Sequence, residues 1–185
     1  FLAFLGRHPL PLLTLLCLAL WLPGIVSLPA LDRDESRFAQ ASHQMLETGD
    51  FVDIRFGQVP RYKKPVGIYW LQSAVTAAAS PFVGIDSIWT YRLASLLGGL
   101  LAVWLTVWCA RAVGPPHAAF LAGALMAVTV LLTGEATIAT TDAVLLACVL
   151  GVQGVLLRLY KAVRTHGPRV SEALVLTGWV ALAAG

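Results

Sequence analysis

One charged stretch lies between long apolar segments, and this distribution limits what the chain can fold into. The sequence holds 23 Asp, Glu, Lys and Arg residues, and twelve of them lie between Asp32 and Lys64. The segments on either side are almost entirely apolar. A charged segment between apolar runs is typical of a water-exposed loop in a membrane protein, and chemistry is expected where charge and membrane meet.

The composition agrees with this interpretation. The chain is 58% hydrophobic and 12% charged, with a mean hydropathy of +0.77, whereas a soluble domain has about 25% charged residues. We therefore predict an all-α polytopic membrane protein. The basic residues form no face with an aromatic platform, so no nucleic-acid partner is expected. Cys17, Cys109 and Cys148 lie inside apolar runs without CxxC spacing, which indicates neither a disulfide framework nor a zinc cluster.

Five apolar segments predict the membrane-spanning helices of a single transmembrane domain: residues 10–28, 89–112, 117–138, 142–163 and 173–185. The first is longer than the apolar region of a signal peptide, about 7–15 residues, so we expect a retained helix. The chain starts without Met and stops inside an apolar run, and we interpret it as the N-terminal part of a longer protein.

The segment 29–88 is predicted to be an external loop with interfacial helices. Asp32-x-x-Glu35 resembles a capping box that opens a helix. Apolar residues then recur at helical spacing, and Gly49 follows at a position typical of a C-cap. This pattern predicts a short amphipathic helix on the membrane surface, whose apolar face holds Phe38, Ala41, Met45 and Leu46.

Residues 65–83 allow two interpretations, because the segment is about long enough to span a membrane but holds several polar side chains. A second crossing here would place the basic segment 158–169 outside and Asp142 inside. If residues 65–83 stay on the outer face, Arg111 and that basic segment become cytoplasmic, as the positive-inside rule expects. Asp142 then lies on the same side as Asp34, and we favour this topology.

Three groups of residues are candidates for chemistry. Asp34, Glu35 and Arg37 begin the expected interfacial helix, where acids also complement the helix dipole. Lys63 and Lys64 are either interfacial anchors or phosphate contacts, since lysine is a strong point-charge donor to phosphate.

The third group consists of Glu135 and Asp142, which are acids at or within the edge of apolar helices. Such acids are costly in a membrane and are functional candidates, although Asp142 also suits a helix cap. Tyr69 is either part of an aromatic belt or part of the site.

Three segments in order carry a resemblance to a known family: LDRDESRFAQASHQMLETGDFV, RYKKPVGIYWLQ and ATIATTDAVLL. Together they strongly resemble polyprenyl-phosphate-sugar-dependent membrane glycosyltransferases of the aminoarabinose transferase and protein mannosyltransferase-like family. The resemblance implies a GT-C fold, a first external loop with juxtamembrane helices, and a catalytic pocket at the outer membrane face.

The resemblance also implies roles for individual residues. Asp34 matches the catalytic carboxylate and Asp142 the second acidic position. Arg37 matches the companion arginine, and Lys64 matches the lysine that contacts the lipid phosphate. The expected substrate-binding set is Glu35, Arg37, Lys63, Lys64 and Tyr69. Family members often have an acid before Lys-Pro, where this chain has Lys63, so a divalent metal is left open and no cofactor is expected with certainty.

The resulting prediction is a glycosyltransferase of the bacterial inner membrane. It would move a sugar from an undecaprenyl-phosphate carrier to a lipid A-type, other lipid or protein acceptor, with membrane lipids around it and the site facing the periplasm. The alternatives are a transporter that uses intramembrane acids, which paired broken helices or an inverted repeat would support, and a catalytically silent scaffold. The sequence shows neither transporter feature.

Overall fold

The computed structural model describes residues 9–30, 33–166 and 171–185. Asp32, Arg7 and Arg169, on which parts of the capping and charge predictions depend, lie outside this part. The described chain forms helices and one small antiparallel hairpin. In chain order the elements are α2 (Pro9–Ser27), α3 (Arg33–Thr48), β1 (Arg55–Phe56), β2 (Val59–Pro60), α4 (Gly67–Val83), α5 (Ile88–Ala110), α6 (Pro116–Ala127), α7 (Val130–Thr137), α8 (Asp142–His166) and α9 (Glu172–Ala184).

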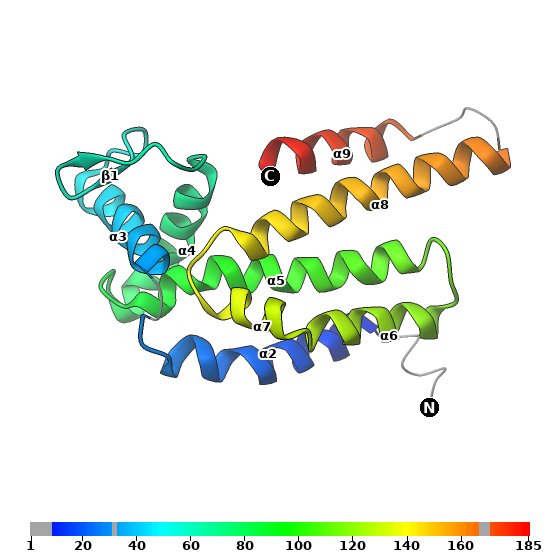
Figure 1. The fold of residues 1–185 in the computed structure, drawn as a ribbon, viewed down its shortest axis with the longest axis horizontal. Helices are drawn as coiled ribbons and strands as arrows, with labels where there is room; N and C mark the ends of the chain where they lie inside the picture. Colours follow the sequence, from blue (N-terminus) through cyan, green and yellow to red (C-terminus); the bar gives the residue numbers. More distant parts are fainter. Residues whose placement is uncertain (1–8, 31–32, 167–170) are drawn as a thin grey trace.

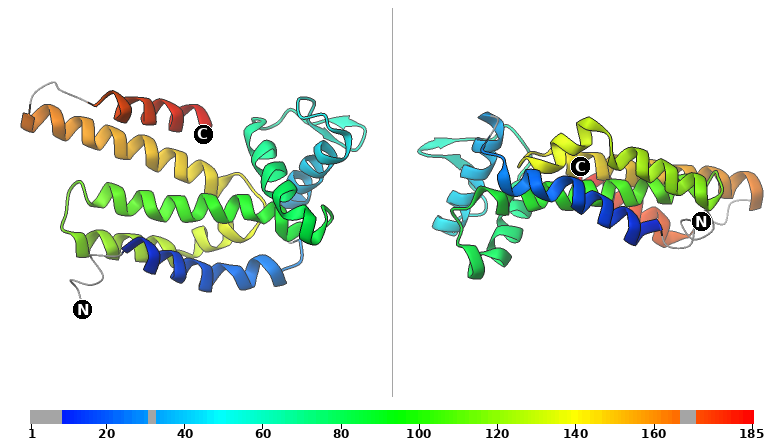
Figure 2. Two further views of the ribbon diagram at one scale, coloured as in Figure 1. Left: turned by 180° about the vertical axis from the view of Figure 1, so that it is seen from behind. Right: turned by 90° about the horizontal axis from the view of Figure 1, so that it is seen from below.

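The helices divide into a bundle and a head. Figure 1 shows α2, α5, α6 and α8 running side by side, with α9 along α8. Helices α3 and α4 and the hairpin gather at one end, and we call residues 33–87 the head. Figure 2 shows from two further sides that the head lies beyond one end of the bundle. The turn between α5 and α6 lies at the opposite end.

Helix α5 is the centre of the bundle, and small residues bring its neighbours close. A Cβ at Gly98 would lie 2.7 Å from the backbone nitrogen of Val144 in α8. A Cβ at Gly99 would lie 3.0 Å from both Ala136 and Trp21. Small residues at helix contacts allow the close backbone approach that stabilises bundles in membranes. The core between α2 and α5 is a continuous apolar cluster that includes Trp21.

Within the described part of the chain, three helices are long and apolar enough to cross a membrane: α2, α5 and α8. The expected span 117–138 is not one continuous helix, because α6 and α7 meet at an angle of 61°. At the break Thr129 is extended, and its hydroxyl donates to the carbonyl of Leu125 at 2.9 Å. The hydroxyl takes the place of the lost backbone donor, which is how threonine makes a helix break tolerable in an apolar setting.

Helix α3 has the amphipathic face that the sequence predicts. Phe38, Ala41 and Met45 are buried, and Leu46 is half-buried. Gly49 adopts φ of 71° and donates its N–H to the Met45 carbonyl at 3.0 Å, so the expected glycine C-cap is confirmed. Helix α4 covers most of the ambiguous segment 65–83 and packs in the head against α3 and α5.

Candidate functional site

A buried arginine joins the head to the bundle. Arg92 of α5 and Glu35 of α3 are both fully buried. The Arg92 Nε and Nη2 donate to the two Glu35 carboxylate oxygens at 2.6 and 3.2 Å. The Arg92 Nη1 donates to the carbonyls of Ile25 and Leu28, and its Nη2 also donates to the carbonyl of Pro29, at 2.7 to 2.9 Å. All five N–H groups of the guanidinium therefore donate hydrogen bonds, and these bonds offset the desolvation of the buried charge.

The same carboxylate reaches the connection between α7 and α8. The backbone N–H of Ala139 donates to Glu35 Oε1 at 3.1 Å. The Ser95 hydroxyl of α5 donates to the Thr140 carbonyl at 3.1 Å. The end of α2, the start of α3 and the residues just before Asp142 are therefore held on α5. We assign Glu35 a positioning role, since its enclosed carboxylate is bound by Arg92 and Ala139.

Asp34 is the next residue along α3 and faces the surface. Its side chain is 58% exposed. Its Oδ1 lies 3.3 Å from Arg37 Nη1 and 3.9 Å from Arg61 Nη2. Two guanidinium groups therefore flank one carboxylate that stays accessible at the surface.

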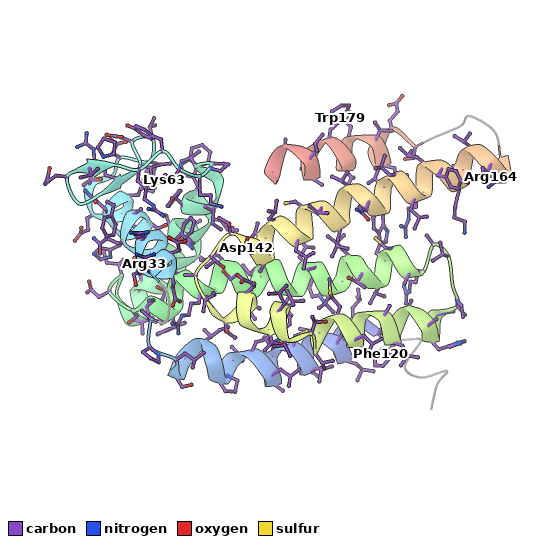
Figure 3. All side chains as sticks on the ribbon, viewed as in Figure 1. Arg33, Lys63, Phe120, Asp142, Arg164 and Trp179 are labelled. Carbon is purple, nitrogen blue, oxygen red and sulfur yellow. The ribbon has the colours of Figure 1, made fainter. Side chains whose placement is uncertain are left out.

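Lys63 and Lys64 follow the hairpin and are exposed (Figure 3 labels Lys63 in the head). Within the described part of the chain, neither ammonium has a hydrogen-bond or ion-pair partner. The preceding loop is held in place by Asp53, whose carboxylate accepts hydrogen bonds from Tyr62 and Arg55. The Tyr62 hydrogen bond, with a second from Arg55, keeps the pKa of Asp53 below its ordinary value, so this carboxylate stays ionised and continues to hold the loop at neutral pH.

Tyr69 lies in the interior of the head. It is fully buried, and its ring centroid is 5.4 Å from that of Phe38. Val144 of α8 packs against the same apolar cluster. The Tyr69 hydroxyl is buried and has no hydrogen-bond partner among the described residues. Buried polar atoms without partners are uncommon, so this hydroxyl stands out within the head.

Asp142 is the first residue of α8 and is exposed at the end of the bundle that carries the head (Figure 3). Glu135 of α7 is half-buried and accepts a hydrogen bond from the Thr140 hydroxyl at 2.7 Å. In the described residues, no three His, Cys, Asp or Glu side chains gather as a metal-binding group. Metal dependence stays an open prediction.

Arg61 and Arg92 are not among the candidate residues that the sequence predicts. Arg92 lies inside an apolar helix, where an ionisable residue is by default a functional candidate, so its position was an available signal. Arg61 precedes the Lys63-Lys64 pair, and only the tertiary structure brings it next to Asp34.

Fold and site together define a polytopic helical membrane protein whose charged head holds an accessible acid between arginines. The chain belongs to the dolichyl-phosphate-mannose-protein mannosyltransferase family, whose model matches residues 10–185. The resemblance expected from the three sequence segments is confirmed.

Several known proteins and solved structures are similar to this chain. It is 32% identical over 139 residues to undecaprenyl phosphate-alpha-4-amino-4-deoxy-L-arabinose arabinosyl transferase 2 of Pseudomonas fluorescens, which covers 75% of this chain and 23% of that protein. The crystal structure of ArnT from Cupriavidus metallidurans in the apo state superposes with a TM-score of 0.77 at 25% identity. The crystal structure of the same protein bound to undecaprenyl phosphate superposes with a TM-score of 0.71, also at 25% identity.

Each ArnT superposition covers 94% of this chain and 31% of ArnT. The predicted helical GT-C fold is confirmed by these structures. The chain spans about a quarter of the length of the curated relative and about a third of the solved one.

Proposed function

We propose that the protein containing this chain transfers a sugar from an undecaprenyl-phosphate carrier to an acceptor outside the cytoplasm. The observation that carries the proposal is the exposed Asp34 carboxylate between Arg37 and Arg61, on the head of a GT-C membrane fold. A relative is named for a transfer from undecaprenyl phosphate, and ArnT has been solved with that lipid bound.

The proposed transfer requires one carboxylate and several cations. An acceptor oxygen attacks the anomeric carbon in line as the bond from that carbon to the phosphate oxygen breaks. The lipid phosphate leaves with its negative charge, which nearby cations stabilise. Arg37, Lys63 and Lys64 lie in the head with Asp34 and are the cations that we assign to this role.

Asp34 takes the proton of a hydroxyl acceptor as a general base. An acceptor that is itself a phosphate is largely ionised at neutral pH and needs no general base, so Asp34 then mainly positions it. Asp142 lies at the same end of the bundle as the head, and we assign it to the second acidic position.

The charge distribution supports an outward-facing head. Arg111, Arg158, Lys161 and Arg164 lie at the end of the bundle opposite the head. Basic residues mark the cytoplasmic ends of membrane helices. We therefore place the head at the outer face of the bacterial inner membrane, with residues 29–88 outside the cytoplasm and α4 at the interface.

The break between α6 and α7 favours a second candidate, because discontinuous helices also occur in transporters. Glu135 lies in the short helix after this break. An ion path would run through this acid, whereas transfer chemistry would run through Asp34.

One experiment separates these functions. The complete protein is reconstituted in vesicles with undecaprenyl-phosphate-linked aminoarabinose and a lipid A acceptor. Transfer predicts labelled lipid A and an equal amount of released undecaprenyl phosphate. Sugar that crosses the bilayer without forming a product would favour transport, and no turnover or flux would favour a scaffold.

A further inference from the structure

Arg61 is fixed in the head by the hairpin that precedes it. Its backbone N–H donates to the carbonyl of Ile54 at 2.7 Å. Ile54 is buried in the apolar cluster that holds Phe38 and Tyr69. The backbone of Arg61 is therefore anchored on both the hairpin and the core of the head, and its side chain leaves from a defined position.

The Arg61 side chain is enclosed but poorly supplied with acceptors. It is 11% exposed, and its guanidinium carbon lies 5.7 Å from the centroid of the Phe38 ring. The distance of 3.9 Å from Nη2 to Asp34 is too long for a hydrogen bond. Its Nε is buried without a hydrogen-bond partner among the described residues. An enclosed charge is costly unless its donors are satisfied, and Nε is a donor that the described residues leave without an acceptor.

Arg92 provides a comparison, because all of its side-chain donors form hydrogen bonds. Its Nε and Nη2 form one edge of the guanidinium and bind the two oxygens of Glu35. The same edge of Arg61 has an unpartnered Nε and an Nη2 that only approaches Asp34. This edge matches an oxyanion with two oxygens, since arginine binds carboxylate and phosphate in a bidentate way. Because Nε is enclosed, an oxyanion from the surface would bind at the Nη2 end, beside Asp34, and its second oxygen would reach Nε only after a small shift of the Arg61 side chain.

The surroundings select phosphate as the oxyanion. Lys63 and Lys64 follow Arg61 within three residues, and Arg37 lies on the other side of Asp34. The cations in this region outnumber the one exposed acid between the arginines. We propose that Arg61 is a further substrate-binding residue that binds a phosphate group of a substrate lipid and positions it beside Asp34. The inference rests on the proposed function, in which both the donor and a lipid A acceptor carry phosphate.

The test compares Arg61→Gln and Arg61→Lys in the complete protein. Undecaprenyl phosphate in detergent micelles is the probe, and its dissociation constant is measured from the ligand-dependent rise in unfolding temperature. We expect Arg61→Gln to raise this constant at least about tenfold, the order expected for one lost charge-assisted interaction. The dissociation constant of Arg61→Lys should lie between those of the wild type and Arg61→Gln, because lysine keeps the charge but loses the bidentate edge.

Arg33→Gln is the matched control, since it removes an exposed positive charge next to Asp34 and should leave the dissociation constant within about twofold. Unfolding temperatures without lipid show whether each variant is folded. Kinetics with the acceptor varied distinguish the two phosphate sources, because a raised acceptor KM with unchanged lipid binding would assign Arg61 to the acceptor phosphate.

Unchanged lipid binding and unchanged acceptor KM in folded Arg61→Gln would overturn the inference. A fall in kcat alone would do the same, because Arg61 would then only orient Asp34. Failure of the proposed function is a separate result: the wild-type protein would not turn over the donor.

Discussion

At the scale of single residues, exposure separates neighbouring acids on α3. Glu35 is fully enclosed by Arg92 and Ala139, whereas the side chain of Asp34, the residue before it, is 58% exposed. Successive residues of a helix point about 100° apart, so one turn of α3 presents one acid to the interior and one to the surface. Glu35 therefore holds neighbouring elements together, and Asp34 is accessible from the surface.

Replacement of Asp34 by Asn keeps the size of the side chain and removes its charge. We expect sugar transfer in the complete protein to fall by about 10²–10⁴-fold, as for loss of a general base. The measurement is transfer of labelled sugar to a hydroxyl acceptor at equal protein abundance. Asp50→Asn is the control, because Asp50 is an exposed acid of the same head whose carboxylate accepts the N–H groups of Val52 and Asp53. Equal activity of Asp34→Asn and wild type would leave Asp34 a helix-start residue without a catalytic role.

The paired lysines give a second prediction at this scale. Lys64→Ala should weaken use of the donor at least about tenfold, because a charge-assisted phosphate contact is worth roughly 1.5–3 kcal/mol. If Lys63 takes the place of a metal, Lys63→Ala should weaken use of the donor by a similar factor, and a chelator should leave the activity of the wild type unaffected. Donor-concentration kinetics with and without chelator provide the measurement. Identical donor kinetics for wild type and Lys64→Ala would remove the phosphate role, and strong inhibition by chelator would refute the metal-free version.

At the scale of elements, α5 positions the site more than any other helix. Its first turns hold Arg92 and Ser95, which bind the end of α2, the start of α3 and the segment before α8. Each of these contacts ends on a backbone carbonyl or on a carboxylate of another element. The helix therefore acts as the common support on which Asp34 and Asp142 are arranged.

Removal of either partner of this pair leaves an uncompensated buried charge. We expect Arg92→Met or Glu35→Leu to destabilise the protein by about 3–5 kcal/mol. The double variant should lose less unfolding free energy than the sum of the losses in the two single variants. The unfolding temperature in detergent provides the measurement. Ser42→Ala is a control for loss of a neutral buried hydrogen bond, because the Ser42 hydroxyl donates to Gln72 at 2.8 Å. Additive effects of the two single changes would show that Arg92 and Glu35 do not act as a pair.

At the scale of the whole molecule, the head lies at one end of the bundle and the described basic residues after α5 lie at the other. This separation gives the chain a polarity along the membrane normal. The position of α4 decides the topology, because a crossing there would invert every element that follows it.

A cysteine at Asp86 tests this arrangement. The Asp86 side chain is 92% exposed in the connection between α4 and α5. We expect Asp86→Cys to react with an impermeant thiol reagent added from outside, because the positive-inside rule places this connection outside. Val113→Cys, in the exposed turn at the other end, should react only after permeabilisation. The reverse pattern would show that residues 65–83 cross the membrane.

The sequence by itself determined the class of the protein and named part of its candidate site. Long apolar runs predict membrane helices, because only helices satisfy every backbone group within such a segment. The amphipathic spacing of Phe38, Ala41 and Met45 and the glycine at Gly49 predicted α3 and its end, because local backbone geometry sets both. Family motifs named Asp34, Lys64 and Asp142, whose roles remain predictions.

Only the tertiary structure decided which charges meet. Arg92 and Glu35 are 57 residues apart and pair only because α5 and α3 pack together. Arg61 reaches Asp34 only because the hairpin folds back over α3. Contacts between distant residues carry no periodic signal along the chain, so no local pattern indicates them.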